Sequence, residues 1–467
     1  MKFSWFKKAK AKTVTTCRAE VDTIRRVFVD TEKVVKKTKK PSYQGLLALL
    51  VFIILFGLSF FGTVTAVSIK NKAGVAKMFQ QGKYLVIFQN NAEMRPTGGF
   101  IGSFAVVDFD GYKVANIDFN TNIFKLDDAF TKTTQIATPV PLNQINQNKW
   151  ALRDSNFAIS YPQTASDIQW FYEQETGKKV DGVIALNATI VQDLLKLTGP
   201  IYLAKYESTI TADNFLDEMA QKIEKEYFYD GAGQTENEPK TILKDLMPVL
   251  IEKTLRLPKY QLLKFGLMSM DKKLVLLQSN NPVVQQSILQ NNWGGAVRET
   301  SSDYLMVNNA NITDLTLLKN GGAKTSLKVK ESIDYQVEEG SNGLQSNLIL
   351  TRSHTGSYAW PDGINMNWTR ILVPVGSTLI KAELNGQEIT SKVVVGPDSG
   401  KTSFGLWINT NPQTSSVLKL SYNLPISANN YSLLIQNQPG NLGDNLKISL
   451  KNRLIFNGIL DQDRVIK

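Results

Sequence analysis

An uncharged apolar run of 22 residues, 46–67, constrains this chain more than any other feature of its sequence. It reads LLALLVFIILFGLSFFGTVTAV, and the nearest charged side chains are Lys40 and Lys70. About 20 apolar residues in a helix are enough to cross the hydrocarbon core of a bilayer. The run therefore predicts a transmembrane helix over residues 46–67, which separates a tail, residues 1–45, from residues 68–467.

The charge of the tail predicts the orientation of the chain. Residues 1–40 hold 13 Lys and Arg against 4 Asp and Glu, a net charge of +9 out of +11 for the whole chain. Basic flanks remain in the cytoplasm, so the bulk of the chain is expected outside the cell membrane, as in a single-pass type II protein. Because the remaining residues carry only +2, the high isoelectric point gives no reason to expect a nucleic-acid partner.

A cleaved signal peptide is the alternative to an anchor, since Val64, Thr65 and Ala66 suit a cleavage site. The apolar run, however, is longer than the roughly 7–15 residues of a signal-peptide core. The single cysteine, Cys17, lies in the tail. Residues 68–467 therefore form no disulfide, and a large exported part without cysteine favours a bacterial origin.

Within the tail, apolar or small residues recur at alternating spacings of three and four. They are Val14, Cys17, Val21, Ile24, Phe28, Thr31 and Val35. This seam is typical of a helix that dimerises as a coiled coil or lies on anionic lipid. An amphipathic basic tail without a specific partner is the third interpretation, and the sequence does not decide among them.

Residues 68–302 mix strand-like and helix-like segments, which predicts a layered α/β or α+β domain. A compact apolar run at 84–88 reads as a buried strand, and 101–109 and 112–119 read as two antiparallel strands around an Asp110-Gly111 turn. Further along, a helix over 165–176 precedes a strand over 180–186. Asn187 is expected to cap the helix that follows.

From residue 303 onward the sequence alternates between apolar and polar positions, and no convincing helix is visible. One strand face is expected to carry Leu327, Val329, Ile333, Tyr335 and Val337. Asn385-Gly386 is a strong signal for a two-residue hairpin turn. The pattern predicts an all-β sandwich over residues 303–467.

The residue inventory excludes several kinds of enzyme. His354 is the only histidine, so a zinc site built from several histidines cannot form, and no thiol nucleophile exists outside the tail. His354 lies in an alternating strand pattern and is interpreted as a surface strand residue. No Gly-Gly pair directly precedes a Lys-Ser or Lys-Thr, so a P-loop is absent.

A polar segment that directly follows the predicted strand 84–88 is the first candidate ligand site. Its glycines allow close backbone approach, and a guanidinium matches phosphate or carboxylate groups. The candidate ligand-binding residues are Asn90, Asn91, Glu93, Thr97, Gly98 and Gly99, with Arg95 as the central group. A tight turn in which Arg95 pairs with Glu93 or another acid is the alternative.

Arg153 and Asp154 form the second candidate, because adjacent basic and acidic groups between aromatic residues can hold a phosphate and a metal together. A structural salt bridge among packed aromatics is the alternative. The sequence itself identifies no metal ligand set.

Six segments resemble a bacterial family catalogued only as domain of unknown function four-zero-one-two. They are QNNAEMRPTGGFIGSF (89–104), LRDSNFAISYPQTA (152–165), VDGVIALNATIVQDLLKLTGPI (180–201), DYLMVNNANITDLTLLKNG (303–321), WTRILVPVGSTLIKAELNG (368–386) and LLIQNQPGN (433–441). The resemblance covers most of residues 70–455. It implies a membrane-anchored, exported bacterial protein of unproven activity.

The order of strand, arginine-bearing loop and strand, with the later segment 180–201, is also similar to the LytR-CpsA-Psr family. That resemblance implies transfer of a glycopolymer from a polyprenyl-pyrophosphate carrier to the cell wall, with arginines on the pyrophosphate and acids on Mg²⁺. Arg95, Arg153 and Asp154 would then be the catalytic residues. Thr97 stands where that family carries an acid, and its Pro-Arg-Asp tripeptide is absent.

Two functions therefore remain open for an extracytoplasmic envelope protein that contacts the lipid bilayer. A phosphotransferase-like enzyme predicts that Arg95, Arg153 and acids converge at a concave site, with Mg²⁺ as the only cofactor implied. A non-enzymatic scaffold or binding protein, working through the β-sandwich surface, predicts that both arginines are buried in salt bridges. The substrate, the acceptor and the oligomeric state are not specified by the sequence.

Overall fold

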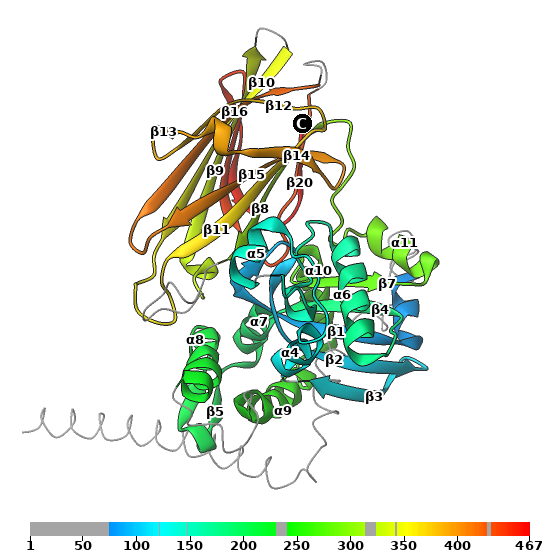
Figure 1. Cartoon of the computed structure of the whole chain (residues 1–467). Helices are drawn as coiled ribbons and strands as arrows, with labels where there is room; N and C mark the ends of the chain where they lie inside the picture. Colours follow the sequence, from blue (N-terminus) through cyan, green and yellow to red (C-terminus); the bar gives the residue numbers. More distant parts are fainter. Residues whose placement is uncertain are drawn as a thin grey trace, which may run out of the picture.

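The computed structural model describes residues 74–467 except 121, 147, 230–240, 313–323, 341–342 and 427–430. The predicted tail and the predicted transmembrane helix at 46–67 both lie outside the described residues. Within them, no helix has the length and apolar character needed to cross a bilayer. The described chain folds into a mixed α/β domain followed by a β-rich C-terminal region, here called the β region (Figure 1).

The α/β domain is organised around a five-stranded mixed sheet with the order β3-β2-β1-β4-β7. The strands are β1 (Gln81–Arg95), β2 (Gly98–Asp110), β3 (Lys113–Asn120), β4 (Gly182–Asn187) and β7 (Val275–Ser279). β1 pairs in parallel with β4, and the other neighbours are antiparallel. The two antiparallel strands expected after the candidate loop are confirmed as β2 and β3.

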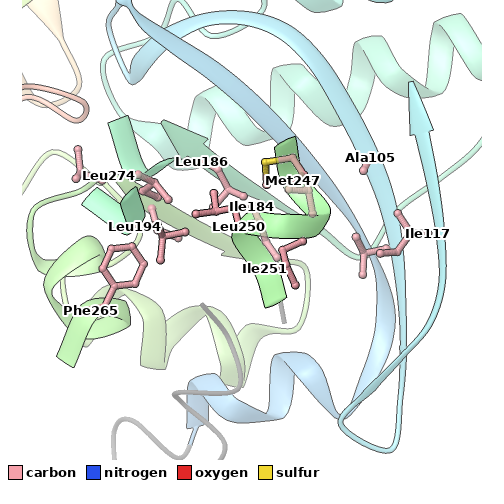
Figure 2. Close-up of a cluster of buried hydrophobic side chains, with 14 of the residues drawn as sticks. Ala105, Ile117, Ile184, Leu186, Leu194, Met247, Leu250, Ile251, Phe265 and Leu274 are labelled. Atoms are coloured by element: carbon pink, nitrogen blue, oxygen red, sulfur yellow. The ribbon is translucent and has the colours of Figure 1, made fainter. Parts of the chain in front are cut away.

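Both faces of this sheet are covered, because successive side chains of a strand point to opposite faces. Tyr84 and Val86 of β1 belong to the larger hydrophobic cluster, whereas Leu85 and Ile87 belong to the smaller one on the other face. Figure 2 shows part of the larger cluster, where Leu186 of β4 lies among Leu194, Leu250 and other helical side chains.

The helices divide between the two faces. Those contributing to the larger cluster are α7 (Thr189–Thr198), α8 (Phe215–Met219), α9 (Thr241–Leu255), α10 (Lys259–Asp271) and α11 (Pro282–Gln290). Those contributing to the smaller cluster are α4 (Ile123–Thr131) and α6 (Tyr161–Thr176). A further helix, α5 (Val140–Asn146), lies at the boundary with the β region, where Leu142 packs near Ala310.

Two sheets make up the β region in the part of the chain that the structure describes. The seven-stranded sheet has the order β13-β12-β16-β10-β9-β18-β19, and the six-stranded sheet has the order β14-β15-β11-β8-β17-β20. The strands are β8 (Asp303–Asn311), β9 (Val329–Gly340), β10 (Gly343–His354), β11 (Asn365–Val373), β12 (Thr378–Leu384), β13 (Gln387–Glu388), β14 (Val394–Asp398), β15 (Lys401–Thr410), β16 (Ser415–Leu424), β17 (Leu433–Ile435), β18 (Asp444–Leu450), β19 (Arg453–Leu460) and β20 (Arg464–Ile466).

One hydrophobic cluster joins the two sheets. Ile333 and Tyr335 of β9 and Ile371 of β11 are buried in it together, which agrees with the alternation seen in the sequence. The predicted hairpin at Asn385-Gly386 is confirmed, because both residues have positive φ and connect β12 to β13. Asn and Gly adopt this backbone conformation at little cost.

Two expectations about single residues are wrong. Ala188, not Asn187, is the N-cap of α7, and the Asn187 amide donates to the Leu274 carbonyl instead. His354 is buried rather than exposed, because β10 buries every second residue and His354 shares the inward face with Arg352. The Nδ1 of His354 accepts from the Gly356 amide, so its Nε2 donates to the Gly363 carbonyl.

The packing of β4 against β7 generates a stability prediction. A Cβ at Gly182 would lie 2.2 Å from the Gln278 carbonyl oxygen, a backbone atom that cannot rotate away. We expect Gly182→Ala to destabilise the protein by about 1–3 kcal/mol, as overpacking does in other cores. Gly396→Ala is the control, because no atom lies within 4 Å of its added Cβ. Chemical unfolding of both variants measures the difference, and equal stability would contradict the close packing.

Candidate functional site

The candidate loop, residues 90–99, is the irregular end of β1 and its connection to β2. The pairing of the two strands shifts register between Asn90 and Met94, which leaves a bulge in β1. A Cβ at Gly99 would lie 2.1 Å from the backbone carbonyl carbon of Asn90, and Gly98 has a φ of 140°. The two glycines therefore allow the connection between β1 and β2 to pack closely against the bulge, where a larger residue would not fit.

Arg95 is enclosed by protein, and its side chain is 2 % exposed. Its Nη2 lies 3.0 Å from Glu93 and 3.6 Å from Asp154, while its Nη1 donates to the Asn311 carbonyl. The guanidinium lies over the Phe100 ring at 5.4 Å. Its Nε is buried without a hydrogen-bond partner among the described residues. The group thus bridges the α/β domain and β8 of the β region.

Glu93 extends this ion-pair network into the β region. Its carboxylate lies 2.5 Å from the Nζ of Lys324, which follows β8 along the chain. Burial alone would raise the pKa of Glu93, but Lys324 and Arg95 outweigh it and lower that pKa. Glu93 is therefore ionised and paired on both sides.

Arg153 and Asp154 lie beside Arg95, as the enzymatic hypothesis predicts. The Asp154 carboxylate lies 3.6 Å from the guanidinium of each arginine, so the three side chains converge. Arg153 also lies 3.6 Å from Asp127 and 3.7 Å from Asp128. Unlike Arg95, Arg153 is partly exposed, with 19 % of its side chain accessible. The catalytic roles assigned to these residues stay a prediction.

Asp127 and Glu175 complete the acidic surroundings of Arg153, and sequence reasoning missed both. The Glu175 carboxylate accepts from the Leu152 amide, and Asp127 accepts from the Arg153 amide. Burial, together with the neighbouring Glu175, raises the pKa of Asp127 to about 9. No local sequence signal marks Asp127, because α4 brings it to Arg153 only through packing.

The remaining candidate residues mostly bind their own chain. The Asn90 side chain accepts from the Ala92 amide, and the Asn91 amide donates to the Gly440 carbonyl of the β region at 2.8 Å and to Thr189. Thr97 is fully buried, and its hydroxyl has no hydrogen-bond partner among the described residues.

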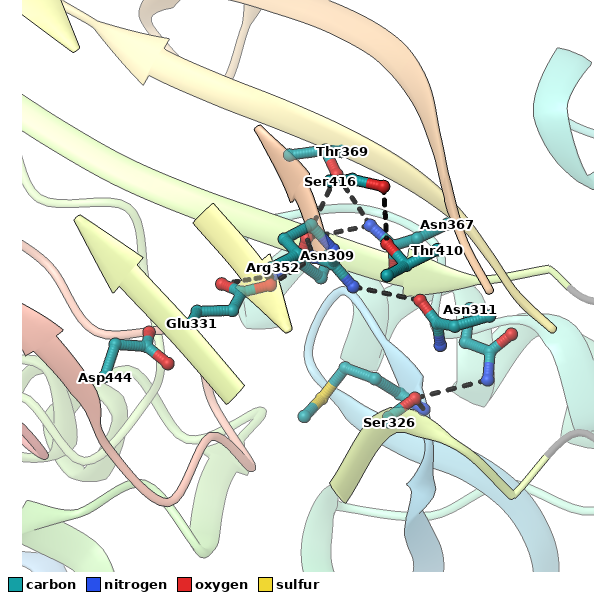
Figure 3. A network of polar contacts seen from close by, with 12 residues as sticks. Asn309, Asn311, Ser326, Glu331, Arg352, Asn367, Thr369, Thr410, Ser416 and Asp444 are labelled. Atoms are coloured by element: carbon teal, nitrogen blue, oxygen red, sulfur yellow. Dashed lines mark hydrogen bonds and ion pairs between the residues drawn. The ribbon is translucent and has the colours of Figure 1, made fainter. Parts of the chain in front are cut away.

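Residues of the β region cover the backbone of the loop. The Gln438 amide donates to the Arg95 carbonyl at 3.0 Å, and the Asn308 amide donates to the Pro96 carbonyl at 2.9 Å. The Ser326 hydroxyl accepts from the Met94 amide at 3.0 Å. Figure 3 shows Ser326, Asn311 and Asn309 at this boundary. The loop is thus the joint between the α/β domain and the β region.

A metal ligand set does not emerge from the described residues, because no group of three or more His, Cys, Asp or Glu side chains is arranged to hold an ion. Mg²⁺ therefore remains a cofactor implied by the LytR-CpsA-Psr resemblance alone.

Residues 80–223 match the model of a family described as "Protein of unknown function (DUF4012)". The matched part of the chain includes the candidate loop and both arginines. The match confirms the first resemblance. It says nothing of the LytR-CpsA-Psr family, and no curated protein matches the chain.

Solved structures give only remote likenesses. A putative nutrient binding protein of Legionella pneumophila is 8 % identical, with a TM-score of 0.19 over 26 % of this chain and 50 % of that one. Aminopeptidase A of the same organism is 13 % identical, with a TM-score of 0.18 over 26 % and 15 %. An M1 zinc metallopeptidase of Deinococcus radiodurans is 15 % identical, with a TM-score of 0.16 over 27 % and 32 %. The chain spans half or less of these proteins, and likenesses of this size carry no functional argument.

The ion pairs of Arg95 generate a second prediction. We expect Arg95→Ala to lower the free energy of unfolding by about 3–5 kcal/mol, because it breaks two buried ion pairs and leaves Glu93 and Asp154 with one cation each, Lys324 and Arg153. Chemical unfolding of the full-length protein in detergent measures the change.

The matched control is Arg256→Ala, which removes an exposed ion pair with Glu252 on α9. Surface substitutions of this kind usually change stability by no more than about 0.5 kcal/mol. If Arg95→Ala cost no more than Arg256→Ala, the ion pairs of Arg95 would not stabilise the joint.

Proposed function

We propose that this chain is a bacterial cell-envelope protein, anchored by residues 46–67 with its bulk outside the membrane, that acts as a non-enzymatic scaffold or binding protein. The α/β domain and the β region, a β-sandwich in this proposal, work as one unit. The exposed surface of the sandwich is the part that meets a cell-wall polymer or another envelope component.

The burial of Arg95 carries this proposal. A pyrophosphate-binding arginine has to present its guanidinium to the ligand, whereas this one is 2 % exposed and its terminal nitrogens contact Glu93, Asp154 and Asn311. A phosphate bound there would have to break these ion pairs, and it would place a further anion beside two carboxylates. Removing one partner of a buried ion pair typically costs about 3–5 kcal/mol.

A second candidate is glycopolymer transfer from a polyprenyl-pyrophosphate carrier. One observation favours it, namely that Arg95 and Arg153 both approach Asp154, and Arg153 is partly exposed. In that reaction Arg153 would stabilise charge on the pyrophosphate, and Asp154 or Glu93 would hold a cation or act as a base.

A transfer assay separates the two functions. Full-length protein in detergent is incubated with a polyprenyl-pyrophosphate-linked glycan, a cell-wall acceptor and Mg²⁺. We expect no turnover above the rate without protein, because the Arg95 guanidinium is buried in the joint and bonded to protein groups rather than available to the pyrophosphate. The measurement is release of the polyprenyl product.

The deciding variant is Arg153→Ala, which removes the more accessible arginine, with Arg256→Ala as the control for a surface change. If the wild type shows turnover and Arg153→Ala loses it at an unchanged unfolding midpoint, the scaffold proposal is wrong and the transferase proposal is supported. Cosedimentation of the inactive protein with isolated cell walls would support the scaffold.

The predicted topology has its own test. Protease added to intact cells, after the outer layers are made permeable, should digest residues 68–467 and spare the tail, since the basic flank stays in the cytoplasm. Immunoblotting with tags at each end of the chain reads the result. If residues 68–467 resist protease in intact cells but are digested after lysis, the envelope location is refuted.

A further inference from the structure

A buried charged network lies in the β region next to the joint (Figure 3). Arg352 of β10 contacts Glu331 of β9, and its other nitrogen donates to Asn365 at 3.0 Å. Asn309 of β8 donates to both oxygens of Glu331, at 3.0 and 3.1 Å. Asp444, the first residue of β18, precedes Asn445, which pairs with Ser332 of β9, so the parallel register places Asp444 next to Glu331. All three charged residues are at least nine-tenths buried.

The charges in this network do not balance when both acids are ionised. The charged groups that act on Asp444 are Glu331, Arg352 and Lys330. Lys330 is on the opposite, exposed side of β9, so Arg352 is the one buried cation facing two buried carboxyls. An uncompensated buried carboxylate is costly, and the common outcome is that one acid of such a pair keeps its proton.

Asp444 is connected to the joint through a short segment, residues 436–440, which we call the strap. The strap contacts several distant parts of the α/β domain. Gln436 donates to the Ala296 carbonyl, Gln438 donates to the Arg95 carbonyl, and the Asn437 carbonyl accepts from the buried ammonium of Lys273. The Gly440 amide also donates to the Lys273 carbonyl.

Asn441 forms hydrogen bonds with both Asp444 and the strap. Its side-chain amide donates to the Asp444 carboxyl at 2.6 Å and to the Asn437 side chain at 3.2 Å. Its backbone amide donates to the Gln438 carbonyl at 3.2 Å. Asp444 is therefore connected through Asn441 to the residues that contact the candidate loop.

We propose that the proton on Asp444 is a latch: it keeps the strap closed on the α/β domain, and its loss releases the strap from the loop at residues 90–99. Loss of the proton places a second carboxylate beside Glu331 with only Arg352 to balance the pair. The repulsion is relieved when Asp444 and Asn441 move toward water, which breaks the contacts of Gln438 with Arg95. The latch is independent of which proposed function is correct.

The pKa of Asp444 supports this direction. Burial and the neighbouring Glu331 raise it from 3.8 to about 8, although Asn441, Arg352 and Lys330 act against the rise. Because the pKa of Asp444 is higher in the closed state than in water, closure of the strap is accompanied by uptake of a proton. The closed state is therefore favoured at low pH, and its advantage is lost as the pH rises from about 4 to about 8.

Hydrogen exchange across pH tests the latch on the full-length protein in detergent. Exchange of peptides covering residues 436–444 is measured by mass spectrometry from pH 6 to pH 8 and corrected for the intrinsic exchange rate. In the wild type we expect the opening equilibrium to rise by up to about tenfold per pH unit, the limit for one proton. In Asp444→Asn, which keeps the acceptor for Asn441 but carries no proton to lose, the dependence should vanish.

Two further variants make the outcome decisive. Asp334→Asn is the control, because it removes a carboxyl on the solvent side of β9 that pairs with Lys447, and it should keep the wild-type dependence. Glu331→Gln removes the neighbouring charge and should move the transition to lower pH, which tests the latch even if Asp444→Asn misfolds. The latch is refuted if Asp444→Asn and wild type show the same pH dependence of exchange. It is also refuted if residues 84–88 of β1 show the same rise in exchange with pH as residues 436–444, because the opening would then not be confined to the strap.

Discussion

A buried polar network around Arg95 and Glu93 fixes how the two halves of this protein meet. Each half has its own hydrophobic core, and among the described residues two small apolar clusters join them, around Ile159 with Tyr304 and around Phe157 with Ala310. Between these clusters the interface is polar. Arg95 pairs with Glu93 on its own strand and donates to the Asn311 carbonyl across the boundary, while Glu93 pairs with Lys324 of the β region. The hydrogen bonds and ion pairs of this network are complete only when both halves are in place. The orientation of the β region thus depends on a few directional contacts rather than on apolar area.

The elements of the fold can be predicted from local periodicity in the sequence, whereas the structural role of the candidate loop cannot. Alternation along β9 and the Asn385-Gly386 turn involve residues that are near one another in sequence, so the pattern is visible in the chain. Asn311 lies 216 residues after Arg95, and Gln438 lies 343 residues after it. No spacing rule connects such positions. The sequence therefore predicts that Arg95 is buried beside acids or binds an anion, but it does not predict that a second domain supplies its partners.

Three of the six segments that carry the family resemblance meet at this joint, although they are far apart in the chain. Residues 89–104 supply the loop, 303–321 supply β8 with Asn311, and 433–441 supply the strap. Such a network needs side chains of particular length and hydrogen-bonding capacity at each place, because a buried polar group without a partner is costly. Contacts between the α/β domain and the β region thus account for the polar side chains of these three segments.

The family match over residues 80–223 covers the loop and both arginines but not the elements that cover them. If the α/β domain is considered alone, Arg95 loses Asn311, Glu93 loses Lys324, and the loop backbone loses Gln438. An exposed arginine between two acids at the end of a buried strand would then resemble an anion-binding site. The same residues act as a joint in the whole chain because the β region supplies the missing hydrogen-bond partners. The surroundings of the candidate loop are therefore a property of the complete two-part unit, since Lys324 and Gln438 of the β region supply an ion pair and a hydrogen bond that the α/β domain alone lacks.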